Sequence, residues 1–268
     1  MAFPPHNPTG HSVEFHFLGT LPFSSALALQ ARLVYEAQGR ADGQIHVVMC
    51  EHESLITIGR RGSRADIRFS GEELRRRGLA IRYVGRSGGT VLHGPGQLAL
   101  YPIVPLAHHG LNRRRLERLL EMALVEGLTS LGFSQLRGGP AGLAGVWGRT
   151  GLIAPFGLAV RGGVSSHGVF LNVHPLAEPM RFIDADLAAL GRFPAAEAAP
   201  QADPLRPRPR AAPSSLVAES RRRVTIPHIR AALVEPLAAA LGASRYHIHS
   251  HHPLVRETLS RLGGPARS

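Results

Sequence analysis

The sequence predicts an α+β fold in which helices flank a mixed β-sheet. Short apolar runs that are typical of strands recur up to residue 173, and two longer segments repeat apolar residues at helical spacing. These two kinds of segment neither alternate strictly nor separate into two blocks, which favours a mixed sheet. With 268 residues and a hydrophobic content of 44%, the chain is long enough to bury the core of such a domain.

The individual elements follow from the apolar spacing. From Ser24 to Glu36, alanine and leucine recur every three or four positions behind the cap candidates Ser24 and Ser25. From Arg113 to Leu131, a leucine-rich stripe predicts a second helix packed on the sheet. Strands are predicted from the apolar runs at residues 45–50, 55–59, 80–84, 98–103, 143–148, 151–160 and 168–173.

A stretch rich in proline and arginine divides the chain. Residues 1–192 are predicted to form the core and residues 193–223 a linker or disordered insertion, because proline removes backbone donors and breaks periodicity. An alternative use of this stretch is an arm that binds an acidic partner. Residues 224–268 are predicted to complete the core with a helix ending at Gly242, kinked or broken at Pro236, and a histidine-rich tail.

The positive charge of the chain is carried by arginine alone. All 31 Lys+Arg residues are arginine, and the formal net charge is +12. The arginines are scattered, aromatic residues make up only 6%, and no nucleic-acid module is recognisable, so we expect no nucleic-acid partner. No apolar run is long enough to cross a membrane, and the N-terminus has no signal-peptide pattern, so we expect a cytoplasmic protein without a membrane partner.

The segment from residue 85 to residue 97, GRSGGTVLHGPGQ, is the most informative part of the sequence. Five glycines and a proline in thirteen positions are a poor choice for an ordinary strand or helix. Glycine is used where another group comes close to the backbone. We therefore expect something to approach this segment closely.

This segment resembles the signature of the octanoyltransferase (lipoate-protein ligase B) family, Arg-Gly-Gly followed by His-Gly-Pro-Gly-Gln. The matching positions, which the resemblance implies line an acyl pocket, are Arg86, Gly88, His93, Gly94, Gly96 and Gln97, together with His167, Gly168 and Asn172 further along the chain. The resemblance covers roughly residues 12 to 187 and implies a biotin/lipoate protein ligase-like fold.

The resemblance also implies a reaction and two partners. In that family a medium-chain acyl group passes from acyl carrier protein to a lysine of a lipoyl domain, without a bound cofactor, through a thioester on a cysteine that works beside a lysine. In this chain Leu152 stands at the position of the family lysine, and Asp186 at or next to the position of the cysteine. Acyl carrier proteins and lipoyl domains are generally acidic, so a basic surface would attract them.

The two substitutions remove the usual chemistry. A thiolate is the nucleophile of such transfers, and a neighbouring base or cation activates it; leucine can do neither. We therefore expect an acyl-binding or carrier-binding protein that does not transfer by the thioester route. The alternative is an acyltransferase or thioesterase with relocated catalytic groups, for which Asp186, His93 and His167 are the candidates. A third hypothesis is a structural or regulatory partner of another lipoylation protein.

Two further side-chain groups have chemistry that could form a site. Cys50, the single cysteine, ends an apolar run and is predicted to be a buried strand residue rather than a replacement nucleophile. In the histidine-rich tail, strand alternation would place His247, His249 and His251 on one face, where three imidazoles could hold a transition metal. Because no cysteine or carboxylate completes that set, we expect no resident metal.

Overall fold

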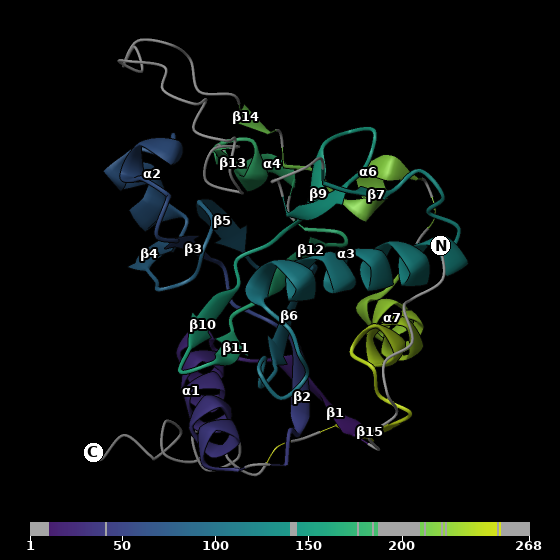
Figure 1. Ribbon diagram of the computed structural model, residues 1–268. Coiled ribbons are helices and arrows are strands. Elements are labelled where there is room, and N and C mark those ends of the chain that lie inside the picture. Colours follow the sequence, from purple (N-terminus) through teal and green to yellow (C-terminus); the bar gives the residue numbers. More distant parts are fainter. Residues whose placement is uncertain are drawn as a thin grey trace, which may run out of the picture.

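The computed structural model describes residues 11–40, 42–139, 144–175, 177–183, 185–186, 210–211, 213–220, 222, 224–250 and 252. A five-stranded sheet with the order β12-β6-β2-β1-β15 lies at its centre (Figure 1). Its strands are β1 (Ser12–Thr20), β2 (Ile45–Glu51), β6 (Gln97–Ile103), β12 (Val169–Asn172) and β15 (Arg245–His249). Strand β1 pairs in parallel with β2 and β15, whereas β6 is antiparallel to β2 and β12, so the predicted mixed sheet is confirmed.

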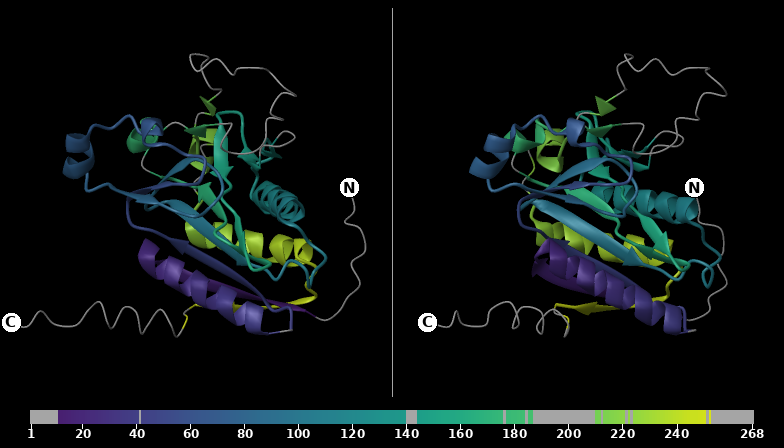
Figure 2. Two further views of the ribbon diagram at one scale, coloured as in Figure 1. Left: turned by 60° about the vertical axis from the view of Figure 1, so that its left-hand side comes forward. Right: turned by 90° about the vertical axis from the view of Figure 1, so that its left-hand side faces the viewer.

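Three long helices cover the two faces of this sheet (Figure 2). They are α1 (Phe23–Gly39), α3 (Arg113–Ser130) and α7 (Ile226–Ala240). Alternate residues of β2 point to opposite faces: Val47 and Met49 belong to the core cluster of α3 and α7, whereas Val48 and Cys50 pack in the cluster of α1. Strands β2, β6 and β12 are therefore buried on both sides, which explains their nearly continuous apolar sequences, whereas the edge strand β15 is exposed along its length.

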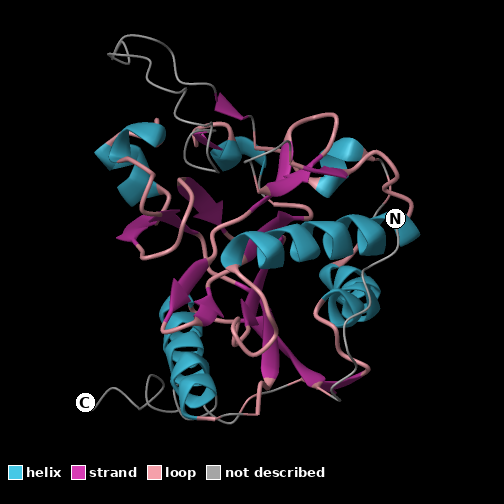
Figure 3. Cartoon of the chain, viewed as in Figure 1, coloured by secondary structure: helices cyan, strands magenta, loops and turns pink. Residues whose placement is uncertain are grey.

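Smaller sheets and short helices surround the central layer (Figure 3). One three-stranded sheet contains β3 (Leu55–Ile58), β4 (Ala80–Tyr83) and β5 (Thr90–His93), and another contains β7 (Arg137–Gly138), β8 (Gly145–Trp147) and β9 (Leu152–Pro155). The pairs are β10 (Ala159–Arg161) with β11 (Val164–Ser166), and β13 (Ala185–Asp186) with β14 (Arg210–Ala211). The short helices are the 3-10 turn Arg64–Asp66, α2 (Gly71–Arg76), α4 (Ala177–Met180) and α6 (Leu216–Glu219).

Two details of the helices differ from the sequence prediction. Helix α1 begins after Pro22 rather than at a serine cap, and the carboxylate of Glu53 accepts the backbone N–H of Phe23 at 2.9 Å. A carboxylate from another loop thus satisfies a donor that a local serine was expected to satisfy. Helix α7 continues past Pro236 as one element instead of breaking there.

The predicted linker, residues 193–223, lies mostly outside the described residues. Its described end differs from the prediction, because Ser214, Ser215 and Leu216 are buried and lead into α6. This end of the stretch therefore belongs to the packed structure. Among the described helices, none combines the length and apolar character that crossing a bilayer requires.

Candidate functional site

The glycine-rich segment, residues 85–97, forms the turns that join β4, β5 and β6. Gly96 has a φ of 84°, and a Cβ there would lie 2.4 Å from the carbonyl oxygen of His174. In the second His-Gly motif, a Cβ on Gly168 would lie 1.9 Å from the carbonyl oxygen of Leu100. The expected close approach is therefore present, and at these two glycines the approaching group is the chain's own backbone.

A continuous chain of hydrogen bonds connects the polar residues of the predicted pocket. Arg86 Nη2 donates to Thr57 Oγ1 at 2.7 Å, and this hydroxyl donates to His93 Nε2 at 2.8 Å. His93 Nδ1 donates to Gln97 Oε1 at 2.8 Å, and Gln97 Nε2 donates to Asn172 Oδ1 at 2.8 Å. Gln97 Nε2 also donates to the carbonyl oxygen of Leu92 at 2.8 Å, so Gln97 Oε1 faces His93 and accepts its Nδ1–H, and the neutral imidazole accepts the Thr57 hydroxyl at Nε2.

These hydrogen bonds limit the chemical role of His93. Both ring nitrogens are occupied, and the side chain is 1% exposed. Burial lowers the pKa of His93 well below its ordinary value, and the neighbouring His52 and Arg86 lower it further. His93 therefore has no free nitrogen for proton transfer, and the geometry suits a positioning role.

An apolar pocket adjoins this chain of bonds, and we call it the central pocket. Its lining residues are Arg86, Gly89, Thr90, Val91, Leu92, Gln97, Leu152, Pro155, Phe156, Asn172, Met180, Ile183 and Pro213. A second pocket, which includes His93 and Gly94, shares Leu92, Gln97 and Met180 with it. Predicted site residues from three parts of the sequence, the segment 85–97, Leu152 and Asn172, are thus brought together at one place.

Leu152 begins β9 and lines the central pocket with its side chain 1% exposed. Its carbonyl oxygen accepts the backbone N–H of Ser214 at 2.8 Å, and Pro213 is its partner in an isolated parallel bridge. The position at which an amine was sought therefore holds an apolar side chain beside the residues that line the predicted acyl pocket.

The backbone around Asp186 borders the same pocket. Asp186 lies in β13 opposite Arg210 of β14, and β13 lies next to β5. Met180 and Ile183, shortly before it in the chain, line the central pocket. The side chain of Asp186 is outside the described part of the structure, so its role as a relocated catalytic group stays a hypothesis.

The family model of the lipoyl protein ligase A/B catalytic domain matches residues 22–238. This chain belongs to that family. Proteins named octanoyltransferase from Chloroflexus aurantiacus and Citrifermentans bemidjiense are each 36% identical to it, over 61% and 63% of this chain and 74% and 78% of theirs. An octanoyltransferase from Porphyromonas gingivalis is 30% identical over 67% of this chain, but only 40% of the relative's length is matched.

Solved structures agree on the fold. A putative lipoate protein ligase from T. acidophilum aligns with a TM-score of 0.63, covering 93% of this chain and 95% of that chain at 16% identity. A lipoate-protein ligase A structure bound with ATP aligns with a TM-score of 0.62 at 16% identity, covering 95% and 94% of the two chains. The predicted membership of the octanoyltransferase family and the ligase-like α+β fold are both confirmed.

His167, the histidine of the second His-Gly pair, has an unusual backbone. Its φ of 52° is in the left-handed region, and its backbone N–H donates to Gln30 Oε1 at 2.7 Å. Burial lowers the pKa of His167 to about 4, and the charges of Arg86 and Arg60 contribute to this shift. Its Nδ1 has no hydrogen-bond partner in the described part of the chain. Unlike His93, it has a free ring nitrogen.

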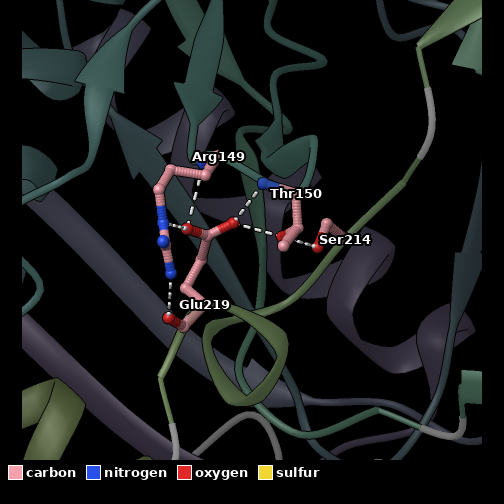
Figure 4. Close-up of polar contacts among 4 residues, drawn as sticks. All are labelled: Arg149, Thr150, Ser214 and Glu219. Carbon is pink, nitrogen blue, oxygen red and sulfur yellow. Dashed lines mark hydrogen bonds and ion pairs between the residues drawn. The ribbon is translucent and has the colours of Figure 1, made fainter.

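The contacts that hold the segment after β14 in this family member carry no recognisable sequence signal. Glu219 accepts the backbone N–H groups of Arg149 at 3.0 Å and Thr150 at 2.6 Å, as well as the Thr150 hydroxyl (Figure 4). Thr150 Oγ1 also lies 2.5 Å from Ser214 Oγ. We call these four residues the Glu219 clamp. It fastens the turn before Leu152 to the segment that contributes Pro213 to the central pocket.

The remaining candidates lie away from the central pocket of this lipoyl ligase family member. Cys50 is 1% exposed, and burial raises the pKa of its thiol, as expected of a core residue. His247 and His249 lie on one side of β15 by strand alternation, and His249 contacts Glu14; His251 lies outside the described residues. In the residues that the structure describes, no three histidine, cysteine or acidic side chains are arranged to hold a metal ion.

Proposed function

We propose that this protein works in lipoyl-group attachment as an acyl- and carrier-binding protein that does not transfer by the usual thioester route. The observation that carries the proposal is Leu152, which lines the central pocket at the family lysine position in a chain that contains no lysine. Without that amine, a cysteine or another thiol would lack its activating partner. A cytoplasmic location is part of this proposal.

The bond chain from Arg86 to Asn172 supports binding rather than catalysis. Its polar groups satisfy one another, which stabilises the pocket wall without leaving a reactive atom on His93. A relocated acyltransferase or thioesterase would therefore depend on Asp186 or His167. Asp186 could accept an acyl group only as a mixed anhydride, which water hydrolyses readily.

The proposed partners are acyl carrier protein and a lipoyl domain. The relatives named octanoyltransferase support the acyl donor, and one structure of similar fold is that of a bipartite lipoate protein ligase and its E2 lipoyl domain from Thermoplasma acidophilum. The net charge of +12 supports an acidic partner of either kind, because opposite charges accelerate encounter at low salt.

One experiment separates the candidate functions. The purified protein is incubated with octanoyl acyl carrier protein and a lipoyl domain, and transfer, hydrolysis and complex formation are followed by intact-mass spectrometry. The proposal expects a complex without transfer or hydrolysis. Octanoylated lipoyl domain or free octanoate above the protein-free rate would contradict it and favour relocated chemistry. No binding of either carrier would favour the structural or regulatory hypothesis.

A further inference from the structure

Among the described residues, strand β15 is paired along one edge only. It is the last strand in the order β12-β6-β2-β1-β15 and runs parallel to β1 (Figure 1). All five of its residues, Arg245–His249, are exposed, whereas β2 and β6 in the middle of the sheet are almost entirely buried. A strand with so little buried surface depends on the side-chain contacts that it makes with its neighbour.

Histidine side chains make several of those contacts. The ring of His16 in β1 stacks on imidazoles from both neighbouring strands, with centroid distances of 5.4 Å to His46 in β2 and 5.2 Å to His249 in β15. His252, shortly after β15, packs edge-on against the same ring at 5.1 Å. These four imidazoles meet on one face of the sheet, and we call them the histidine cluster.

His16 is the most deeply buried member of the histidine cluster. It is 6% exposed, and its Nε2 lies 3.1 Å from Nδ1 of His46. A hydrogen bond between these two nitrogens requires that one donate a proton and that the other accept it with a lone pair. The bond is therefore lost when both rings are fully protonated.

Basic groups outnumber acidic groups around the histidine cluster. Glu14 contacts His249 and can compensate one imidazolium, whereas the charges of Glu36 and Arg40 shift the pKa of His46 in opposite directions. Full protonation would therefore leave an excess of positive charge on rings whose centroids are 5.1–5.4 Å apart. The charged or titratable side chains that face the cluster are Glu14 on β1, Glu36 and Arg40 at the end of α1, and Arg245 and His247, which strand alternation places on the same side of β15 as His249.

The pKa values of the buried rings agree with this packing. Burial, followed by the charges of His46, His252 and His249, lowers the pKa of His16 to about 3. Burial also lowers the pKa values of His46 and His252. In water the pKa of an imidazole is about 6.5. The packed cluster is therefore favoured above about pH 6.5, and any state that hydrates these rings gains on it as the pH falls below that value.

The histidine cluster can be opened at β15 more readily than at β2. His249 and His252 cover the ring of His16, and they belong to the exposed edge strand and to the residues just after it. Strand β2, which carries His46, is paired on both sides and buried. Departure of β15 would hydrate His16 and remove two of its three imidazole neighbours, while the core stays packed.

We propose that β15 is an edge strand that acid releases: it pairs with β1 while His16 and His46 are neutral, and it detaches when this pair takes up protons. Release uncovers the backbone N–H and C=O groups along one edge of β1, where another extended segment can then pair. The central pocket stays in place, because β12, which contributes Asn172 to it, lies at the opposite edge of the sheet. The inference is therefore independent of the proposed function.

The test is hydrogen exchange of the full chain, followed by mass spectrometry at pH 7.5 and pH 5.5, with EDTA present so that no metal holds the histidines. Protection factors, which correct for the direct effect of pH on exchange, are compared for peptides that contain β15 and β6. One buried histidine that regains an ordinary pKa on release shifts the equilibrium about tenfold over this range. We therefore expect the protection of β15 to fall at least about tenfold and to stay below that of β6 at both pH values.

Two results would overturn the inference. Unchanged protection of β15 between the two pH values would show that protons do not release the strand. Protection of β15 equal to that of β6 would show that the strand leaves the sheet only when the whole protein unfolds.

Two variants and a control identify the groups responsible. His16→Phe keeps a ring in the histidine cluster but cannot take up a proton, so the fall in β15 protection should shrink to about threefold or less. Glu14→Gln removes the carboxylate that attracts protonated His249, so release should begin at a higher pH. His228→Phe, at an exposed position of α7 outside the cluster, should respond like the unmodified protein.

The variants can also contradict the inference. A full response in His16→Phe would exclude the buried pair as the trigger, and release at a lower pH in Glu14→Gln would contradict the charge argument. Circular dichroism checks that each variant folds. If His16→Phe does not fold, the unmodified protein and Glu14→Gln decide the question.

Discussion

The backbone N–H of Ser214 donates to the carbonyl oxygen of Leu152 at 2.8 Å. This single bond joins two segments that the sequence separates by 62 positions, because Leu152 begins β9 and Ser214 lies within the stretch predicted as a linker. Asn172 Nδ2 donates in turn to the carbonyl oxygen of Ser214 at 2.9 Å. The described end of that stretch, with Pro213 and Ser214, is therefore part of the pocket wall. Its hydrogen bonds to β9 and to Asn172 should control the stability of the site.

Glu219→Gln should loosen this attachment. Burial alone would raise the pKa of Glu219, but the hydrogen bonds from Thr150 and Arg149 outweigh it and lower the pKa overall. Glutamine keeps the shape of the glutamate side chain but removes its charge and one of its two acceptor oxygens. We therefore expect the free energy of unfolding to fall by about 1–3 kcal/mol. Urea denaturation measures this, with Glu235→Gln on the exposed side of α7 as the matched control. Equal stabilities of the two variants would show that the Glu219 clamp contributes little.

The contribution of the Glu219 clamp to stability should depend on pH. Because the folded-state pKa of Glu219 is below its unfolded value of about 4.3, its contribution is present above that pH and is lost as the pH falls through the folded pKa. The stability difference between the unmodified protein and Glu219→Gln should therefore shrink below about pH 4. A difference that persists at pH 3 would mean that charge is not what holds the segment.

Gly96→Ala should be strongly destabilising, whereas Gly78→Ala should not. Both glycines have positive φ, 84° and 63°, so both substitutions carry the same kind of backbone strain. Only Gly96 has a close neighbour, since its Cβ would lie 2.4 Å from the carbonyl oxygen of His174, whereas nothing lies within 4 Å at Gly78. We expect Gly96→Ala to cost about 2 kcal/mol more in thermal or urea unfolding. Similar losses would mean that the loop moves aside freely.

The contrast between Gly96 and the Glu219 clamp shows what could be predicted from the sequence. The glycine-rich motif identified Gly96 and its neighbours because the close approach is encoded within thirteen residues. The contacts of Glu219 could not be predicted, since they join residues about 70 positions apart and the stretch before them has the composition of a linker. The role of Thr57 could not be predicted for a related reason: its segment shares the family resemblance, but its hydrogen bonds join it to His93 and Arg86, 36 and 29 positions away.

Acid should also destabilise the protein through His16. This imidazole packs against His46, His249 and His252, and burial together with their charges lowers its pKa to about 3. A histidine with a depressed folded pKa favours unfolding as the pH falls below its unfolded value of about 6.5. Between pH 6.5 and pH 4.5 this group should cost about 2.5 kcal/mol.

The variant His16→Phe isolates this effect. Phenylalanine keeps a ring among the neighbouring imidazoles but cannot be protonated, so the unfolding free energy of the variant should fall less steeply with pH over the same range. Urea denaturation at several pH values between 4.5 and 7 makes the comparison. Parallel pH profiles for the two proteins would show that His16 is already protonated or solvated in the folded state.

Cys50 should resist thiol reagents in the native protein. It is 1% exposed, lies in the core cluster under α1, and has a raised pKa because of burial. The thiolate is the reactive form, so both its concentration and its accessibility are low. We expect no labelling by a disulfide reagent under native conditions and complete labelling in guanidinium, followed by absorbance. Rapid native labelling would reopen Cys50 as a nucleophile.

A lysine at position 152 should show, through its effect on stability, whether water reaches the central pocket. In Leu152→Lys the new ammonium would be buried near the cation Arg86, and both effects lower its folded-state pKa below the unfolded value of about 10.4. At pH 7 the variant should be about 2–4 kcal/mol less stable than the parent. The loss should diminish as the pH rises towards 10, because a neutral amine is cheaper to bury. Val160→Lys, at a position 40% exposed, provides the control and should show neither effect. A pH-independent loss in Leu152→Lys would mean that the amine reaches water and that the loss comes from the missing leucine packing alone.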